Sequence, residues 1–200
     1  GSSSALSQLK TQIQRASVAS GSVSLTGEIG VGKNLCARLL HDLSPRKKQP
    51  LVIWSPLSQS DEAISESLFG TELSQNGTPV RKEGALEYVR EGTLVITDVE
   101  KIPMYLQSRL AEALKGNSFM REGGRQSIPF KGRIVVTSTR PLSEEQRFGK
   151  VSPELFHLLH GIEISVPPLR DRKEDILEIF DFFFARASAD QGLSKLEISP

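Results

Sequence analysis

The stretch GEIGVGKN at residues 27–34 decides the fold that this sequence can adopt. It follows an alternating segment typical of a strand at residues 22–26, and it precedes apolar residues at helical spacing, namely Leu35, Leu39, Leu40 and Leu43. Glycines in such a turn let successive backbone N–H groups point inward, and the N-terminus of the following helix adds partial positive charge. Lys33, at the end of the turn, can then reach the terminal phosphates of a nucleotide. The stretch therefore predicts a phosphate-binding loop. Its expected nucleotide-binding residues are Gly27, Glu28, Gly30, Val31, Gly32, Lys33, Asn34 and Leu35.

One residue of this loop departs from the usual pattern. A serine or threonine normally follows the lysine, and its hydroxyl ligates Mg²⁺, whereas Asn34 stands there in this sequence. An amide oxygen is a poorer substitute for that hydroxyl. ATP or ADP with Mg²⁺ is still the cofactor that the loop predicts.

Strand and helix signals alternate along the rest of the chain. Short apolar segments rich in β-branched residues predict strands at 22–26, 51–54, 94–96, 134–136 and 162–166. Helical spacing predicts helices at 8–16, 35–43, 60–69, from 103 onward, at 154–160 and at 173–189. Residues 71–83 have little apolar content and predict a loop, whereas a Gly-Gly pair predicts a hairpin within 117–132. This alternation predicts an α/β fold with a mostly parallel five-stranded sheet and helices on both faces.

Composition narrows the class of protein. The 200 residues carry 25 Lys and Arg against 24 Asp and Glu, so the net charge of +1 gives no strong field to attract nucleic acid or an anionic membrane. The one cysteine, Cys36, cannot form an internal disulfide, and no apolar run approaches the roughly 20 residues that span a bilayer. These counts favour a soluble, cytoplasmic protein without a membrane partner. Residues 1–4 are typical of an expression scar and are left out of the fold prediction.

Five segments occur in an order that resembles a known family. They are GEIGVGKNLCARLLH at 27–41, SESLFG at 65–70, EGTLVITDVEKIPMYLQSRLAEAL at 91–114, GRIVVTSTRPL at 132–142 and VPPLRDRKEDI at 166–176. Together they resemble the central AAA+ (sigma-54 interaction) domain of NtrC-type bacterial transcription activators. The resemblance implies a P-loop AAA+ core over residues 5–185 and the start of a truncated helical lid at 186–200. It also implies self-association as a dimer or hexamer, and a response regulator that contacts DNA only through a C-terminal domain outside this chain.

The segments that would carry the family's activity differ from its pattern. Active members contact sigma-54 through a GAFTGA loop, and the corresponding stretch here, TELSQNGTPVRKEGAL at 71–86, lacks it. The family's Walker B pair is an aspartate for Mg²⁺ and a glutamate for the attacking water, and the flanking motifs place Thr97 and Asp98 at these positions. A shift of one residue would instead make Asp98 the metal ligand and put Val99 at the water-positioning place. One carboxylate is lost in either register, and Asp98 is the candidate catalytic residue and candidate metal ligand.

Three further positions differ in the same direction. The sensor I asparagine of the family corresponds to Thr139, the second candidate catalytic residue, which Arg140 follows. The family's arginines that reach a neighbouring subunit's nucleotide correspond to Ser152 and Leu158, and neither side chain is a cation. Arginine fingers are worth about 10³- to 10⁵-fold in the rate of phosphoryl transfer. The resemblance therefore implies a degenerate AAA+ ATPase.

Three hypotheses for the function follow from this combination. The first is the central domain of a bacterial sigma-54-type transcriptional regulator that binds nucleotide weakly or not at all and hydrolyses little ATP. This domain would control transcription by self-association and by contact with RNA polymerase holoenzyme. The second is an active, ATP-hydrolysing sigma-54 activator domain that uses Asp98 and Arg140 in altered roles, and the third is a structural oligomerisation domain without nucleotide. VpsR-like regulators, which resemble this family, lack GAFTGA and respond to cyclic di-GMP, so that cyclic di-GMP is a further candidate effector.

Overall fold

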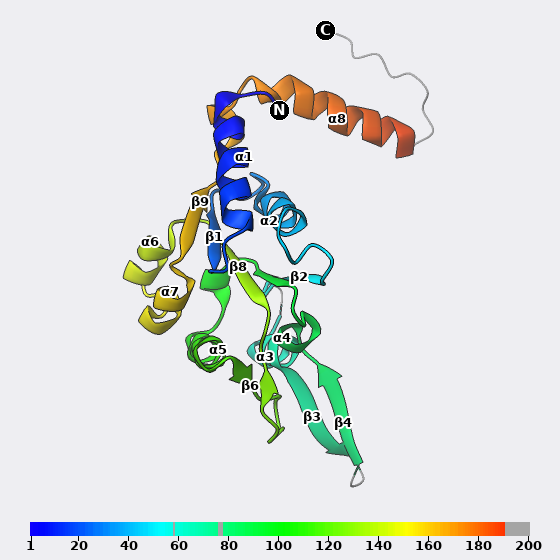
Figure 1. The fold of residues 1–200 in the computed structure, drawn as a ribbon, viewed down its shortest axis with the longest axis vertical. Helices are drawn as coiled ribbons and strands as arrows, with labels where there is room; N and C mark the ends of the chain where they lie inside the picture. The colour runs from blue at the N-terminus through cyan, green and yellow to red at the C-terminus, as the bar shows by residue number, and fades with distance from the viewer. Residues whose placement is uncertain (58, 76–77, 191–200) are drawn as a thin grey trace.

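A parallel β-sheet lies at the centre of the computed structural model, which describes residues 1–57, 59–75 and 78–190 (Figure 1). Its strands are β1 (Val23–Thr26), β2 (Leu51–Trp54), β5 (Thr93–Ile96), β8 (Arg133–Ser138) and β9 (Ile162–Ser165). They lie in the order β2-β5-β8-β1-β9, and all four neighbouring pairs are parallel. The predicted α/β fold with a five-stranded parallel sheet is confirmed.

Helices cover both faces of this sheet. The helices are α1 (Ser4–Ser17), α2 (Lys33–Asp42), α3 (Asp61–Phe69), α4 (Ala85–Tyr88), α5 (Met104–Gly116), α6 (Leu142–Arg147), α7 (Pro153–Leu159) and α8 (Asp175–Asp190), with short 3₁₀ turns η1 (Val99–Lys101) and η2 (Leu169–Asp171). Side chains of β5 alternate between the two faces: Val95 packs with α1 and α2, whereas Leu94 and Ile96 pack with α3 to α7. This period of two is the reason that a continuous apolar run such as TLVI forms a strand buried on both sides.

The buried face of α2 differs from the one that leucine spacing predicted. Leu35 is 72% exposed and Leu39 and Leu43 are partly exposed, so these three leucines do not form the core face. The small side chains of Cys36 and Ala37 face the sheet instead, together with Leu40. The turn before α2 fixes the residue at which the helix begins, and this sets the rotation of the helix about its axis. Small side chains on the inner face then allow α2 to lie close to the strands.

The described residues of 71–83 belong to two paired strands of a hairpin, so the prediction of a loop there was wrong. Strand β3 (Gly70–Gln75) pairs antiparallel with β4 (Thr78–Glu83), and the hairpin projects from the body of the domain (Figure 1). Its base is joined to the segment after β6 (Ser118–Phe119), because Glu72 N–H donates to the carbonyl of Glu122. A second, smaller hairpin, β6 with β7 (Ile128–Pro129), confirms the one predicted within 117–132.

A buried arginine holds the base of the β3–β4 hairpin. Arg121 is 9% exposed and donates to Glu87 of α4 at 2.6 and 2.9 Å and to Glu72 of β3 at 3.0 Å. The hydrogen bonds that Arg121 donates to Glu87, more than the one it donates to Glu72, raise the pKa of Arg121. Arg121 is 34 positions from Glu87 and 49 positions from Glu72 in the sequence. No local pattern within 71–83 therefore predicts these contacts.

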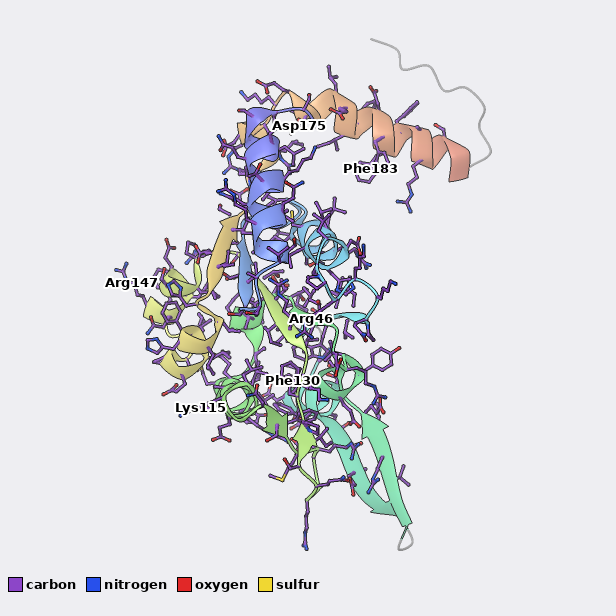
Figure 2. The ribbon with its side chains drawn as sticks, viewed as in Figure 1. Arg46, Lys115, Phe130, Arg147, Asp175 and Phe183 are labelled. Carbon is purple, nitrogen blue, oxygen red and sulfur yellow. The ribbon has the colours of Figure 1, made fainter. Side chains whose placement is uncertain are left out.

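The N-terminus lies beside the start of α8, at the end of the domain opposite the hairpin (Figure 1). Ser3 caps α1 by accepting from Leu6 N–H, and Ser2 and Ser3 also donate to the buried carboxylate of Asp175 at the start of α8 (Figure 2). These bonds, led by the Ser3 hydroxyl, lower the pKa of Asp175. The predicted lid segment at 186–200 lies outside the described residues from 191 onward. Within the described part of the chain, no helix is long and apolar enough to cross a membrane.

Replacement of Arg121 by Met should lower the free energy of unfolding by about 3 kcal/mol, because it leaves the nearly buried carboxylate of Glu87 without its cation and Glu72 with the exposed Arg81 alone. Urea unfolding followed by circular dichroism measures the loss. Arg81→Met is the matched control, since Arg81 also pairs with Glu72 but is 52% exposed. An exposed pair contributes about 0–1 kcal/mol, so equal losses in the two variants would contradict the role given to Arg121.

Candidate functional site

The carboxyl ends of three neighbouring strands meet at one edge of the sheet. In the parallel register Ile96 of β5 lies beside Val136 of β8, and Ser138 of β8 lies beside Thr26 of β1. The segments that follow these strands therefore start side by side, which is where ligands bind in open parallel α/β sheets. These segments carry the loop at 27–32, the pair Thr97–Asp98, and Thr139.

Three glycines give the loop at 27–32 its shape. Gly27, Gly30 and Gly32 have φ values of +146°, +84° and +103°, which residues with a side chain rarely adopt. At Gly27 a Cβ atom would also lie 2.7 Å from the carbonyl oxygen of Val166, whereas at Gly30 and Gly32 it would meet no atom within 4 Å. Gly27 is thus required both for its conformation and for close approach to the residue after β9, and the other two for conformation alone.

The loop directs a lysine and a helix N-terminus into the same space. Gly32 is the N-cap of α2 and supplies no side-chain hydrogen bond, so the first amides of the helix keep no cap from a side chain. Lys33 Nζ lies over the loop and donates to the carbonyls of Gly27 at 2.7 Å and Glu28 at 2.9 Å. Its side chain is 9% exposed, and its ammonium group is held where the loop curls. This arrangement concentrates positive charge for an anion.

A cavity of about 770 Å³ lies on one side of the loop, between it and α8. Predicted residues Glu28, Gly30, Val31, Gly32 and Leu35 line it, and Phe182 and Phe183 of α8 line its opposite wall (Figure 2). Arg170 bridges its rim by donating to both carboxylate oxygens of Glu28, at 2.6 and 2.7 Å, and this bond lowers the pKa of Glu28. Arg172 donates to the Val31 carbonyl at 2.9 Å. The 166–176 segment is therefore attached directly to the loop.

A second cavity of about 600 Å³ lies on the other side of the loop, at the strand ends. It brings together Lys33 and Asn34 with Asp98 and Thr139, which the sequence predicted as separate site residues. Thr97, which the sequence predicted at the first Walker B position, is 6% exposed and also lines it. Every predicted site residue thus lies on one of the two cavities, apart from Gly27, which shapes the loop beneath them.

Glu100 belongs to the second cavity, although the sequence had not indicated it. Its Oε1 accepts from the Thr139 hydroxyl at 3.2 Å and from the Thr139 N–H at 3.4 Å. Asp98 is in the left-handed region with φ of +48°, and the 3₁₀ turn that follows brings Glu100 back to the end of β8. No sequence motif assigns a role to the residue two positions after Asp98. Glu100 reaches the cavity because of the left-handed conformation of Asp98, which the sequence does not reveal.

The described residues contain no group of three or more His, Cys, Asp or Glu side chains that could hold a metal ion by themselves. His41 is buried and shares a hydrogen bond of 2.9 Å with the Thr93 hydroxyl, so its role is in the core. Cys36 is buried as well, and burial raises the pKa of its thiol. A cation in the second cavity would therefore depend on ligand oxygens as well as on Asp98 and Asn34.

Comparison with known proteins assigns the family. The sequence model of a protein family, the sigma-54 interaction domain, matches residues 1–165 of the chain. The chain belongs to the sigma-54 interaction domain family. A curated relative, the nitrogen assimilation regulatory protein NtrX of Azorhizobium caulinodans, is 32% identical over 198 residues, which are 99% of this chain and 43% of that protein. The chain thus spans less than half the length of this relative and matches the central domain of NtrC-type regulators.

Solved structures of relatives share the fold of this sigma-54 interaction domain. Crystal structures of NtrX from Brucella abortus in complex with ATP and with ADP give TM-scores of 0.90 and 0.91 at 30% identity. Each match extends over the whole of this chain and over 43% (ATP complex) or 44% (ADP complex) of the NtrX chain. The P-loop NTPase domain of a sigma-54 transport activator from E. coli gives a TM-score of 0.58 at 20% identity, over 84% of this chain and 99% of that one. The predicted P-loop AAA+ core is confirmed.

The two positions expected to correspond to the family's arginines, Ser152 and Leu158, line neither cavity, and the same is true of Arg140. Ser152 is buried and caps α7 by accepting from Leu155 N–H, and its own N–H donates to Gln107 Oε1 at 2.8 Å. Arg140, beside Thr139, lies with its guanidinium 5.2 Å from the centre of the Phe148 ring. Neither residue lines either cavity.

Alanine at Gly27 should destabilise the domain more than alanine at Gly30, because both carry backbone strain and only Gly27 also meets Val166. We expect a loss of about 1 kcal/mol in the free energy of unfolding for Gly30→Ala and about 3 kcal/mol for Gly27→Ala. Urea unfolding of the two variants beside the parent chain measures the difference. A Gly27→Ala variant as stable as Gly30→Ala would show that the close approach to Val166 has no energetic weight.

Proposed function

We propose that this domain is the nucleotide-binding regulatory module of an NtrC-type transcription regulator, and that it binds ATP or ADP and hydrolyses ATP slowly. The observation that supports it is the loop at 27–32, with Lys33 and the N-terminus of α2 directed at one cavity. This geometry is the one required for an anionic polyphosphate. It favours nucleotide binding over the alternative of a purely structural oligomerisation domain.

The solved relatives support the choice of ligand. The Brucella NtrX structures, at 30% identity, are described as complexes with ATP and with ADP. In this chain the 770 Å³ cavity between the loop and α8 has an apolar wall of Phe182 and Phe183, which suits a base, and the loop separates it from the strand-end cavity, which suits phosphates. The shared loop residues Gly30 and Gly32 join the two spaces.

The residues of the strand-end cavity fit Mg²⁺ as a partner of the nucleotide. Asp98 offers a carboxylate and Asn34 an amide oxygen, which are hard donors of the kind that Mg²⁺ prefers. One or two carboxylates with phosphate oxygens are a usual ligand set for this ion. When bound, Mg²⁺ would neutralise charge on the phosphates, and Lys33 would add a second cation from the protein.

Slow hydrolysis follows from what the cavity and its surroundings lack. Thr97 replaces the carboxylate that the family uses for the metal, and a hydroxyl cannot balance the charge of a hydrated divalent ion. Ser152 is fixed as a buried helix cap, so this position cannot offer a cation to a neighbouring subunit. Arg140 is directed at Phe148 rather than at the phosphate loop. Together these features support a domain that senses nucleotide more than it consumes it.

Transcriptional control would then depend on contacts of the domain with other proteins. We propose self-association, and contact with RNA polymerase holoenzyme in place of the sigma-54 remodelling that GAFTGA loops perform. The support is the β3–β4 hairpin, whose sequence lacks GAFTGA and whose base is held by Arg121. DNA would be contacted by another domain of a longer protein. Cyclic di-GMP is kept as an alternative effector, to be tested beside ATP.

Replacement of Lys33 by Ala should weaken ATP binding by about 10- to 100-fold, because it removes the charge-assisted hydrogen bonds to the terminal phosphates. Isothermal titration calorimetry of the 200-residue chain with ATP, ADP and cyclic di-GMP measures this. Lys47→Ala is the control, since Lys47 is exposed in the turn before β2. Binding that is unaffected in the Lys33 variant, or absent from the parent chain, would contradict the proposal.

Replacement of Thr97 by Asp should raise the rate of ATP hydrolysis by roughly tenfold, which corresponds to about 1.4 kcal/mol of barrier. The reason is that it returns the missing carboxylate to the metal side of the cavity. Phosphate release under saturating ATP and Mg²⁺ gives the rate. The double variant with Lys33→Ala controls for contaminating ATPases, and an unchanged rate in the single variant would show that Thr97 is not what limits hydrolysis.

A further inference from the structure

Glu100 carries a buried carboxylate oxygen that the fold leaves without a partner. The residue is 8% exposed, and its Oε1 is bound by Thr139. The other oxygen, Oε2, is shielded from solvent and has no hydrogen-bond partner among the residues that the structure describes. A buried carboxylate oxygen in this state is unfavourable unless a donor approaches it. Glu100 lines the strand-end cavity, so a small movement of its carboxylate toward this cavity would bring Oε2 within reach of a donor there.

We infer that Glu100 orients the water that attacks the γ-phosphate of bound ATP, so that Asp98 and Glu100 together replace the usual Walker B pair. The inference rests on the proposed nucleotide site and assigns the slow turnover to a particular residue. Asp98 then serves the metal side of the cavity, and Glu100 serves the water.

The backbone after β5 explains why Glu100 and not Val99 can take this place. Asp98 has a left-handed conformation, and Lys101 N–H donates to the Asp98 carbonyl at 2.8 Å, which closes the 3₁₀ turn. This turn buries Val99 completely in the core and returns Glu100 to the cavity. A simple shift of the Walker B register by one residue would have put an apolar side chain at the water position, and the turn replaces it with a carboxylate.

Thr139 fixes the orientation of Glu100. Its hydroxyl and its N–H both donate to Oε1, which leaves Oε2 as the free acceptor of the carboxylate. Glu145 is a second buried carboxylate near this hydroxyl, with Oε1 3.5 Å from Thr139 Oγ1, but it does not line the cavity. A hydroxyl has one proton to donate, so the Thr139 hydroxyl donates to Glu100, which is the nearer of the two carboxylates.

The chemistry is the hydrolysis of a phosphoanhydride. Glu100 Oε2 would accept a hydrogen bond from water and direct its oxygen at the γ-phosphorus. A bond forms between the water oxygen and the γ-phosphorus, and the bond from that phosphorus to the β–γ bridging oxygen breaks. The bridging oxygen leaves with the electron pair as part of ADP, one proton of the water stays on inorganic phosphate, and the other proton is released to solvent. Lys33 would hold the β- and γ-phosphates in line during this displacement.

Glu100→Gln is the direct test, because it keeps the size of the side chain and removes its ability to act as a charged acceptor. We expect kcat for ATP to fall at least about tenfold, the low side of what such groups contribute. The Kd for ATP, measured by calorimetry, should change by less than about threefold, because Glu100 contacts water and not the phosphates. Glu100→Asp should give a partial loss, since the carboxylate then ends one methylene short.

Glu145→Gln is the matched control, since it alters the other buried glutamate near Thr139 without touching the cavity. Its kcat should equal that of the parent chain, and thermal midpoints of all variants should show that the fold is intact. Equal turnover of the Glu100→Gln variant and the parent would overturn the inference, as would equal losses in the Glu100 and Glu145 variants. A parent chain that binds ATP and releases no phosphate would overturn it while leaving the proposed binding function in place. A parent chain that binds no ATP would overturn both.

Discussion

The parallel pairing of β5, β8 and β1 is the constraint on which the rest of the structure depends. Because these strands run the same way and in fixed register, the residues that follow Ile96, Ser138 and Thr26 must begin at one edge of the sheet. The phosphate loop, the acidic residues and Thr139 then converge without any direct attraction between them. Burial on both faces maintains this pairing, since consecutive residues of β5 pack into the two separate cores. A shift of one strand by a single residue would turn each of its side chains to the opposite face of the sheet and would separate the residues of the site.

The site that results is preserved unevenly. The side proposed for the phosphates departs from the usual loop at Asn34 alone: Gly27 passes close to Val166, Lys33 lies over the loop, and Arg170 joins Glu28 across the rim. The side proposed for the reaction carries Thr97 at the position predicted for the family's carboxylate, and Glu100 enters it from the following turn. A binding function needs only the first of these sides, whereas rapid turnover needs both. The contrast between the two supports a domain that has kept nucleotide recognition and changed its use.

The elements that sequence reasoning placed correctly are those with strong local signals. The apolar runs that became β2, β5 and β8 could only be stable when buried, and the predicted helix at 60–69 became α3 with Ser60 as its N-cap. The β3–β4 hairpin was missed because its stability comes from Arg121, which lies far away in the sequence and reaches Glu72 and Glu87 only after the chain has folded. The inner face of α2 was missed for a related reason, since the loop before it fixes its rotation and small residues at 36 and 37 face the sheet.

The sequence by itself determined the fold class, the phosphate loop and the family, because glycine spacing, apolar alternation and motif order depend on neighbouring residues alone. The sequence also contains no GAFTGA, and its motif order predicts that Thr97 stands at the position of the Walker B aspartate. Only the tertiary structure decided that Asp98, Thr139 and Lys33 line one cavity and that Glu100 joins them. The physical reason is that a left-handed residue followed by a 3₁₀ turn redirects the chain after β5. The side chain it redirects is held by Thr139, 39 residues away, through a contact that no local pattern encodes.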